Sequence, residues 1–250
     1  MPRTSVTIPT LDGTCSATLH TPADGGGHPA VVLHADAAGV RETFALMADR
    51  LAGLGYAVLL PDAYYRTPFA PFDIATVFSV PEERQRLSAL MASVTTEPAV
   101  RDMGAYLEFL AERKEVSGTA VGTTGYCMGG KLSLLAAVHY PERVAAAASF
   151  HGGNLAVEDD EDSPYRLADR IRATVYVAAA ENDKAFPADQ YERLESALAD
   201  AGVRHTLVTY PAEHGFAVSD NPTYDSEAGQ RHWEALAGLY AQNLPGSARA

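Results

Sequence analysis

The feature of this sequence that most constrains its fold is a repeated alternation of short apolar runs with longer amphipathic segments. The apolar runs are "PAVVLH", "YAVLLPD", "GTAVGTTG", "RVAAAASF", "ATVYVAAA" and "RHTLVTY", and each has the length of one buried strand. Segments with helical spacing separate them, at 42–55, 128–139, 187–202 and 224–244. This order predicts an α/β fold with a mostly parallel central sheet and helices on both of its faces.

Two parts of the chain depart from this alternation. At the N-terminus, "SVTIPT" and "TCSATLHT" flank Asp12 and Gly13, which predicts an antiparallel hairpin. After the proline-rich "RTPFAPFD", two helical segments follow each other at 81–93 and 97–113. Neither a linker nor a repeat divides the sequence, so we expect one domain over residues 1–250, with a loose tail at 245–250.

The charge and the cysteines exclude several classes of partner. A net charge of −13 argues against a nucleic acid or an anionic membrane, because phosphates would be repelled. The N-terminal "MPRTSVTIPT" has no apolar segment of the secretory type, and no apolar run is long enough to cross a bilayer. Cys15 and Cys127 supply neither a disulfide framework nor a zinc pattern. We therefore expect a cytoplasmic protein that is a monomer or a small homo-oligomer.

Any chemistry is expected at one edge of the sheet, because ligands of such folds bind beyond the carboxyl ends of the strands. The segments that follow the predicted strands are 34–38, 62–65, 126–128, 150–154, 181–186 and 211–216. The acidic run "EDDED" (158–162) lies in the long connection after the strand that ends at Phe150. A solvated loop is its simplest interpretation, and metal binding is a weaker alternative.

A sharp strand-to-helix turn is indicated at "TGYCMGGK" (124–131). The pattern Gly-x-Cys-x-Gly-Gly has the outline of a nucleophile elbow, which exposes its central side chain on a strained turn. Cys127 would then lie at a helix N-terminus, where the helix dipole and free N–H groups favour a thiolate. The N–H groups of Met128 and of Ala37, which follows an earlier strand, are the expected oxyanion-hole donors.

Other interpretations of this segment remain open. Cys127 can be a small buried residue that packs between strand and helix, as lone cysteines often do. The segment can also be a phosphate-binding loop, but the spacing of Gly122, Gly125 and Gly129 does not match G-x-G-x-x-G. A redox-sensing thiol is disfavoured because no resolving cysteine lies in the same region.

An acid and a histidine follow Cys127 in the order that a nucleophile–acid–histidine triad requires. "ENDKAFP" follows one predicted strand and "PAEHGF" the next, which places Asp183 and His214 just beyond two carboxyl ends. His151, in "FHGG", also ends a strand, but it precedes Asp183, so we expect it to line the pocket instead of serving as the base. A turn or a helix cap before Pro187 is the alternative role for Asp183.

The segments "GYCMGG", "ENDKAF" and "HGF", in this order and spacing, resemble the dienelactone hydrolase family of α/β hydrolases. The resemblance runs from about Val6 to Leu244 and includes "VLHADAAGVRETFALMADRLAGLGYAVLLPDAYYR". It implies the α/β-hydrolase fold, with its mostly parallel sheet and N-terminal antiparallel hairpin. It also implies a Cys-His-Asp triad, which falls here on Cys127, His214 and Asp183.

The resemblance implies further residues around the triad. A carboxylate in the oxyanion loop engages the resting thiol and helps to deprotonate it when substrate binds. The matching residue is Asp36, where well-known members have glutamate. A loop residue hydrogen-bonded to nearby backbone is the alternative role for Asp36. Two arginines hold the substrate carboxylate in the members that cleave dienelactone. "ERQR" matches the first, which points to Arg86, with Arg84 as the alternative. An exposed helix face shared with Glu82 and Glu83 is the non-functional interpretation of both arginines. "HGFAV" places Val218 at the second position, so one charge-assisted anchor is missing.

Together, the residues and the resemblance predict a hydrolase that cleaves an ester or a lactone through a thioester on Cys127. This chemistry requires no metal and no organic cofactor, and its only partner is a small-molecule substrate. Aromatic side chains are expected to line the pocket, chiefly Tyr64, Tyr65 and Phe69, together with Phe216. Packing in the core is the alternative role for each of them. A general carboxylesterase or thioesterase of the same fold is the nearest alternative. A non-catalytic α/β protein that binds a small ligand is an alternative of another class.

Overall fold

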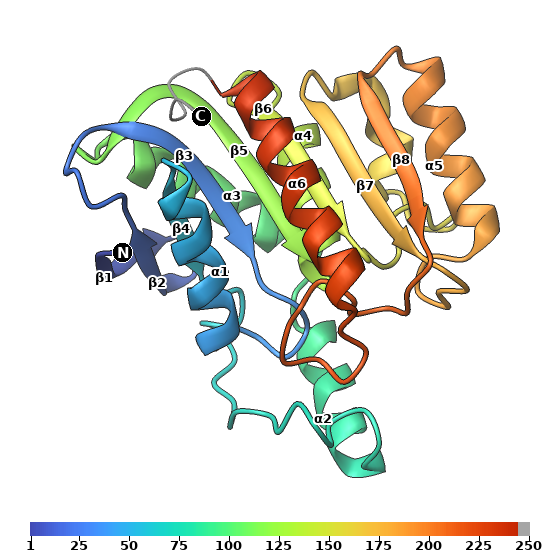
Figure 1. The fold of residues 1–250 in the computed structure, drawn as a ribbon. Coiled ribbons are helices and arrows are strands. Elements are labelled where there is room, and N and C mark those ends of the chain that lie inside the picture. Colours follow the sequence, from blue (N-terminus) through green and yellow to red (C-terminus); the bar gives the residue numbers. More distant parts are fainter. Residues whose placement is uncertain (245–250) are drawn as a thin grey trace.

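The computed structural model describes residues 1–244, and the predicted loose tail at 245–250 lies outside the described residues. One sheet contains all strands of this part, in the order β1-β2-β4-β3-β5-β6-β7-β8 (Figure 1). The strands are β1 (Arg3–Thr10), β2 (Gly13–His20), β3 (His28–His34), β4 (Ala57–Pro61), β5 (Val116–Tyr126), β6 (Val144–Phe150), β7 (Thr174–Ala180) and β8 (His205–Tyr210).

The pairing of the strands confirms the predicted fold class. β1 and β2 form the N-terminal antiparallel hairpin, in which Ile8 lies opposite Cys15, and β2 pairs antiparallel with β4. All other neighbours, from β4 through β3 to β8, are parallel. Parallel strands need crossover connections, and the helices between them provide these. The molecule is therefore an α/β structure with a mostly parallel sheet.

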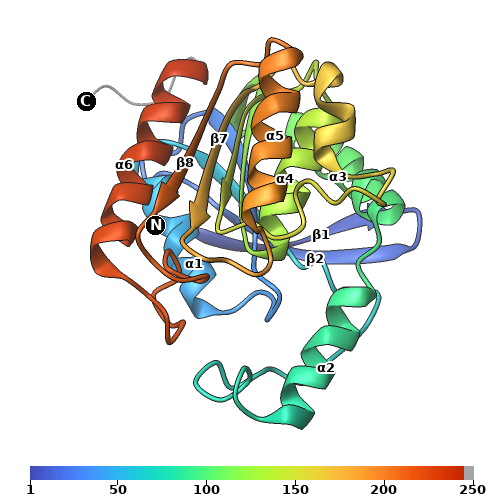
Figure 2. The same ribbon diagram turned by 90° about the vertical axis from the view of Figure 1, so that its right-hand side faces the viewer.

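Helices cover both faces of the sheet (Figure 2). α1 (Glu42–Gly53) and α6 (Ser226–Asn243) pack on one face, and their buried Phe44, Met47 and Leu236 join a single apolar cluster with the sheet. α3 (Thr96–Ala111), α4 (Met128–His139) and α5 (Ala188–Asp200) pack on the other face. Burial on both faces explains why the central strands read as continuous apolar runs.

Two segments differ from the simple alternation. α2 (Pro81–Ala92) projects from the body near the ends of the strands, and only Leu87 and Leu90 of this helix are buried (Figure 2). The long connection after β6, which the sequence analysis treats as a loop, contains a 3₁₀ helix, η1 (Pro164–Arg170). Its apolar positions, such as Ala168, join the core on the side of α4 and α5. Short 3₁₀ turns of this kind have little periodicity, so sequence patterns rarely reveal them.

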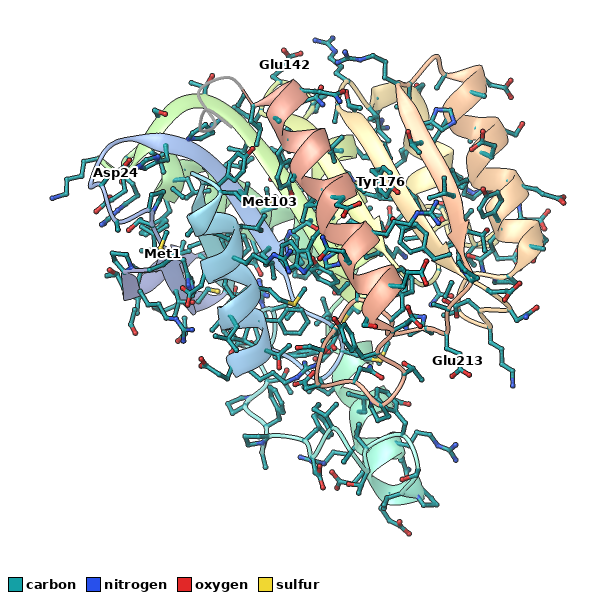
Figure 3. All side chains as sticks on the ribbon, viewed as in Figure 1. Met1, Asp24, Met103, Glu142, Tyr176 and Glu213 are labelled. Carbon is teal, nitrogen blue, oxygen red and sulfur yellow. The ribbon has the colours of Figure 1, made fainter. Side chains whose placement is uncertain are left out.

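The parallel strands end at one edge of the sheet, as their common direction requires. In Figure 3, Glu213, which directly precedes His214, lies at this edge, whereas Glu142 and Asp24 lie toward the opposite one. The loops that follow β3, β4, β5, β6, β7 and β8 therefore approach one another. Among the described residues, no helix combines the length and the apolar character needed to cross a membrane.

Candidate active site

Cys127 lies at the turn between β5 and α4, in a backbone conformation that side chains other than glycine rarely adopt. Its φ is 53° and its ψ is −117°, and it directly precedes the first residue of α4. The backbone of this turn is therefore strained, as in a nucleophile elbow. The thiol is half-buried and forms no disulfide. The predicted elbow geometry is present.

Two glycines allow β5, β3 and α4 to approach closely around this turn. A Cβ atom on Gly125 would lie 1.8 Å from the carbonyl oxygen of Gly129. A Cβ atom on Gly129 would lie 2.4 Å from the carbonyl oxygens of both His34 and Ala35. All of these neighbours are backbone atoms, so a rotamer change cannot relieve the overlap. Glycine is required at both positions because no other residue fits between the strands and the helix.

Replacing Gly129 by alanine is expected to destabilise the protein by more than about 4 kcal/mol, because the new methyl group displaces backbone on two elements. Urea unfolding followed by circular dichroism measures this loss. Gly238→Ala in α6 is the matched control, since no atom lies within 4 Å of the added Cβ. It should stabilise the protein by about 0.5–1 kcal/mol through helix propensity. Equal effects of the two substitutions would contradict the steric explanation.

Asp183 and His214 meet beside Cys127 although they follow different strands. His214 Nδ1 lies 2.6 Å from Asp183 Oδ2, and the carboxylate is buried while the imidazole is one-third exposed. The other carboxylate oxygen, Asp183 Oδ1, accepts a hydrogen bond of 2.8 Å from the Ala185 N–H. Both carboxylate oxygens are therefore held, and the imidazole is held through one nitrogen. The order nucleophile, acid, histidine is realised in space.

The electrostatics of His214 couple it to the cysteine. Burial lowers the pKa of His214, but hydrogen bonds to Asp183 and Cys127, together with their negative charges, raise it to about 10. The anionic sulfur is thus one of the causes of the elevation. The imidazolium is therefore the charge state of His214 that these contacts favour at neutral pH. The second cysteine differs, because burial raises the pKa of Cys15 to about 11.

Two backbone N–H groups lie beside the elbow without a partner. Among residues 1–244, neither Ala37 N–H nor Met128 N–H donates a hydrogen bond to a backbone carbonyl. Tyr64 connects their two segments, since its hydroxyl donates to the Ala37 carbonyl oxygen at 2.9 Å and lies 3.4 Å from Met128 Sδ. Free N–H groups on two adjacent segments are the elements of an oxyanion hole. Tyr64, expected as part of the pocket, is buried beneath this pair.

The expected contact between Asp36 and the thiol is wrong for this structure. Both oxygens of the Asp36 carboxylate accept from Arg41, at 2.7 and 2.9 Å, and Oδ1 also accepts from Ala38 N–H at 3.0 Å. No hydrogen bond joins Asp36 to Cys127 in the described part of the chain. The physical reason is the bidentate guanidinium five residues away, which binds a carboxylate better than a neutral thiol does.

Two other expected pocket residues lie elsewhere. The Arg86 guanidinium donates to the Ala70 carbonyl oxygen at 2.7 Å and lies 4.0 Å from the Phe72 ring centre. It is outside the cavity at Cys127, because these contacts hold it against the loop before α2. The Tyr65 hydroxyl donates to buried Asp102 at 2.9 Å, beneath the N-terminal hairpin. Both are corrections to the sequence analysis.

His151 packs against His214 and Phe216, and neither His151 nor Phe216 lines the cavity at Cys127. Their expected role as pocket walls is corrected by this position. The His151 ring packs edge-on against His214, with 5.1 Å between ring centres, and against Phe216 at 5.0 Å. Both residues are fully buried. Burial holds the pKa of His151 well below its usual range, and the charge of His214 lowers it further. His151 is thus a neutral ring that fixes the position of His214.

A cavity of about 210 Å³ opens at Cys127. α4 forms one wall and the junction of α2 with α3 forms another, while the loops after β6 and β7 close a third side. Apolar residues predominate, and two threonines lie where α3 begins. The lining residues are Met91, Val94, Thr95, Thr96, Cys127, Met128, Lys131, Leu132, Leu135, Gly153, Asn154 and Ala185.

Lys131 is the one cation among these lining residues, and no motif of the sequence singled it out. Its ammonium group lies 2.6 Å from Asp160 Oδ2, so the acidic run "EDDED" contributes a partner to the cavity wall. The helical spacing could have identified Lys131 as a lining residue, because it lies four positions after Cys127 and so shares its side of α4. Within residues 1–244, no cluster of three His, Cys, Asp or Glu side chains is arranged to hold a metal ion.

The doubly covered parallel sheet, the cysteine elbow after β5 and the acid and histidine after β7 and β8 define an α/β hydrolase. The family model of the dienelactone hydrolase family matches residues 15–244. The chain therefore belongs to the dienelactone hydrolase family, and it is a hydrolase of the dienelactone hydrolase-like carboxylic ester hydrolases. The resemblance stated from the motifs is confirmed.

Individual proteins agree with this assignment. The chain is 29% identical to a "Putative carboxymethylenebutenolidase" of Methylorubrum extorquens, with 95% of this chain and 80% of that protein covered. It is 28% identical to a protein of the same name from Synechocystis, with 96% and 97% covered. A crystal structure of a "Putative Dienelactone Hydrolase" from Klebsiella pneumoniae has a TM-score of 0.83 at 24% identity and covers 96% of this chain and 98% of that one.

Proposed function

We propose that this hydrolase cleaves an ester or a lactone through a thioester on Cys127. The observation that carries the proposal is the hydrogen bond of 2.6 Å between His214 and Asp183, on a histidine whose pKa the neighbouring Cys127 helps to raise. A nucleophile, a base and an orienting acid are thereby in contact at the carboxyl edge of the sheet. The family gives independent support for hydrolysis.

In the first half of the reaction, the Cys127 thiolate attacks the carbonyl carbon of the substrate. The N–H groups of Met128 and Ala37 stabilise the negative oxygen of the tetrahedral intermediate. The intermediate collapses as the C–O bond to the leaving alcohol breaks, and the His214 imidazolium gives its proton to that oxygen. The products are a thioester on Cys127 and an alcohol, which in a lactone remains attached to the acyl group.

In the second half, water hydrolyses the thioester. Neutral His214 removes a proton from water, and the hydroxide attacks the thioester carbonyl, again with its oxygen at Met128 and Ala37. The C–S bond then breaks, which regenerates the thiolate beside the imidazolium and releases the carboxylic acid. Asp183 stays ionised throughout and stabilises the imidazolium. No step passes through a metal or an organic cofactor.

The charge of the cavity wall favours a neutral acyl group. Arg86 is held outside the cavity, and Val218 is fully buried, so neither supplies an anchor for a substrate carboxylate. Lys131 is the one lining cation, and Asp160 already balances its charge. A carboxylate that enters must compete with Asp160 for the same ammonium group. We therefore propose neutral esters or lactones as better substrates than anionic ones of equal size.

Replacing Asp160 by asparagine tests this preference. The variant frees Lys131, so the ratio of kcat/KM for 4-nitrophenyl hemisuccinate to that for 4-nitrophenyl valerate should rise by about tenfold, as one charge-assisted hydrogen bond allows. Asp159→Asn is the matched control, because Asp159 is exposed and its substitution removes the same charge from the same loop. Equal ratios in both variants would show that Lys131 does not meet the substrate.

A general carboxylesterase or thioesterase shares the same machinery, and the apolar cavity of about 210 Å³ favours it over an enzyme restricted to small charged lactones. A panel of 4-nitrophenyl esters, five-membered lactones and an acyl thioester, assayed with the wild type, separates these activities. The proposal expects hydrolysis of at least the esters or the lactones. A protein that binds these compounds without hydrolysing any would instead be the non-catalytic ligand-binding protein.

A further inference from the structure

Arg41 lies between the two loops that carry parts of the proposed active site. It precedes α1 and is largely buried, with 16% of its side chain exposed. On one side it binds Asp36 through two nitrogens, at 2.7 and 2.9 Å. On the other side it binds Asp220 in the same manner, at 2.7 and 2.9 Å. A fifth contact, of 3.2 Å, reaches the Gly39 carbonyl oxygen. These contacts use all the hydrogen-bonding capacity of a guanidinium group.

Each of the two carboxylates belongs to a loop with a role in the proposed mechanism. Asp36 directly precedes Ala37, one of the free N–H groups beside the elbow. Asp220 lies in the loop 214–225, which begins with His214 and is closed by a hydrogen bond from Thr223 Oγ1 to the His214 carbonyl oxygen. Arg41 therefore connects an expected oxyanion donor to the histidine through two paired ion contacts. Paired contacts of this geometry fix orientation as well as distance.

The second consequence of these contacts concerns the Asp36 charge. Tyr64 touches both the Ala37 carbonyl oxygen and Met128, which directly follow Asp36 and Cys127 in the chain. Burial raises the pKa of the Tyr64 hydroxyl, and the negative charges of Cys127, Asp36 and Asp62 raise it further. Asp36 thus lies within electrostatic reach of the cysteine environment. An unpaired carboxylate there would oppose a thiolate and offer the thiol a competing acceptor. While Arg41 holds both oxygens, neither effect operates.

The titratable groups around Cys127 are few. His214 faces it from the loop after β8, with Asp183 behind, and Tyr64 faces it from the loop after β4. Lys131 on α4 is paired with Asp160, and His151 touches His214 instead of the sulfur. The junction of α2 and α3 contributes only uncharged side chains to the cavity. Arg41 is the cation that balances Asp36.

We propose that Arg41 is a positioning residue that occupies Asp36 and ties the oxyanion loop to the His214 loop, so that Cys127 pairs with His214 and not with Asp36. The proposal rests on the proposed function for its kinetic consequences, but its effect on the thiol can be measured without turnover. The ion pair with Asp220 holds the two loops in position, and the ion pair with Asp36 neutralises the Asp36 carboxylate. The first effect is called mechanical and the second electrostatic. The two effects can be separated by substitution.

The test compares Arg41→Met, Asp36→Asn, Arg41→Met/Asp36→Asn and Asp220→Asn. The first readout is the pH dependence of Cys127 alkylation by iodoacetamide, followed by peptide mass spectrometry, with buried Cys15 as the internal control. Arg41→Met should move the midpoint of the profile upward by about one pH unit, because it leaves an unbalanced carboxylate near the sulfur. The double variant should return the midpoint to the wild-type value.

The second readout is kcat for 4-nitrophenyl acetate, which Arg41→Met and Asp220→Asn should each lower by about 10- to 100-fold through a misplaced loop.

An unchanged midpoint in Arg41→Met, or one that the added Asp36→Asn does not reverse, would overturn the proposal, since a merely structural arginine predicts no such reversal. If circular dichroism shows that Arg41→Met does not fold, Asp220→Asn is the deciding variant. A lowered kcat with an unchanged midpoint of Cys127 alkylation then supports the proposal, and an unchanged kcat overturns it. A wild type that hydrolyses nothing would end the proposed function. The alkylation profiles would still decide the role of Arg41.

Discussion

Replacing Cys127 by alanine is expected to lower kcat for 4-nitrophenyl esters by about 10⁴- to 10⁶-fold, as the loss of a nucleophile does in comparable triads. The side chain lies on a strained turn with φ of 53°, beside His214 and two unpaired N–H groups. Within residues 1–244, the hydroxyls of the other lining residues, Thr95 and Thr96, have no histidine or carboxylate hydrogen-bonded to them. Steady-state assays with purified wild type and variant measure the difference, and the variant should still bind substrate because its cavity is intact.

Cys15→Ala provides the matched control, because it removes the other thiol of the chain. Cys15 lies on β2 of the N-terminal hairpin, where it is fully buried and its sulfur is 3.4 Å from the Tyr106 hydroxyl. Its replacement should change kcat by less than about twofold while it lowers stability modestly. Hydrolysis at the wild-type rate in Cys127→Ala would refute the cysteine mechanism. A loss of activity in both variants would point to a folding defect instead.

Replacing Asp183 by asparagine is expected to lower kcat by about 10³- to 10⁴-fold, close to the effect of the same change in serine triads. The amide retains an acceptor for Ala185 N–H, so the loop should keep its shape. It removes the negative charge that helps to raise the pKa of His214 to about 10. The imidazolium is then less stable, so the His214 pKa should fall toward its ordinary value of about 6.5.

The pH dependence gives the sign of this effect. In the wild type, His214 keeps its proton up to about pH 10. In Asp183→Asn, His214 should lose the proton at lower pH. The alkaline decline of kcat should therefore begin at a lower pH than in the wild type, because a neutral imidazole cannot protonate the leaving alcohol. NMR titration of the imidazole together with kcat profiles measures both changes. Asp189→Asn is the control, since Asp189 is exposed on α5 and pairs with Arg193 instead of a histidine. A His214 pKa that is equal in both variants would contradict the assigned role of Asp183.

Much of the fold was predictable because the central strands are apolar on both faces. Runs such as "RVAAAASF" and "ATVYVAAA" have no strong alternative to a buried strand when helices alternate with them. The connection after β6 was not predictable in detail. Its 3₁₀ helix is held by tertiary contacts of residues such as Ala168, and local periodicity does not record these.

The meeting of Cys127, Asp183 and His214 at one place was predictable for a topological reason. The carboxyl ends of parallel strands lie at one edge of the sheet, so Cys127 after β5, Asp183 after β7 and His214 after β8 come close together. The contacts of long side chains were not predictable in this way. Arg41 binds Asp36, which is close to it in the sequence, and also Asp220, which is 179 residues away. Arg86 is drawn to the Phe72 ring and to a carbonyl oxygen instead of the cavity.

Tyr65 illustrates the same limit at a single position. It is adjacent to Tyr64, and both follow β4 at the active edge of the sheet. Tyr64 turns toward Ala37 and Met128, whereas Tyr65 turns toward Thr10 and Asp102 of the hairpin side. Neighbouring residues in an irregular segment often point in different directions, and only the available hydrogen-bond partners decide which one enters a site. Sequence adjacency is therefore a poor guide to pocket walls.

The covalent thioester is the central claim, and trapping it is the most direct measurement. The wild type and a His214→Ala variant are incubated with 4-nitrophenyl acetate, quenched in acid, digested and analysed by mass spectrometry. The peptide that contains Cys127 should gain one acetyl group, and the label should accumulate in His214→Ala because water is no longer activated for its release. Brief treatment with hydroxylamine should remove it. Turnover of the ester by the wild type, with no acetyl group on Cys127 in either protein, would contradict the account.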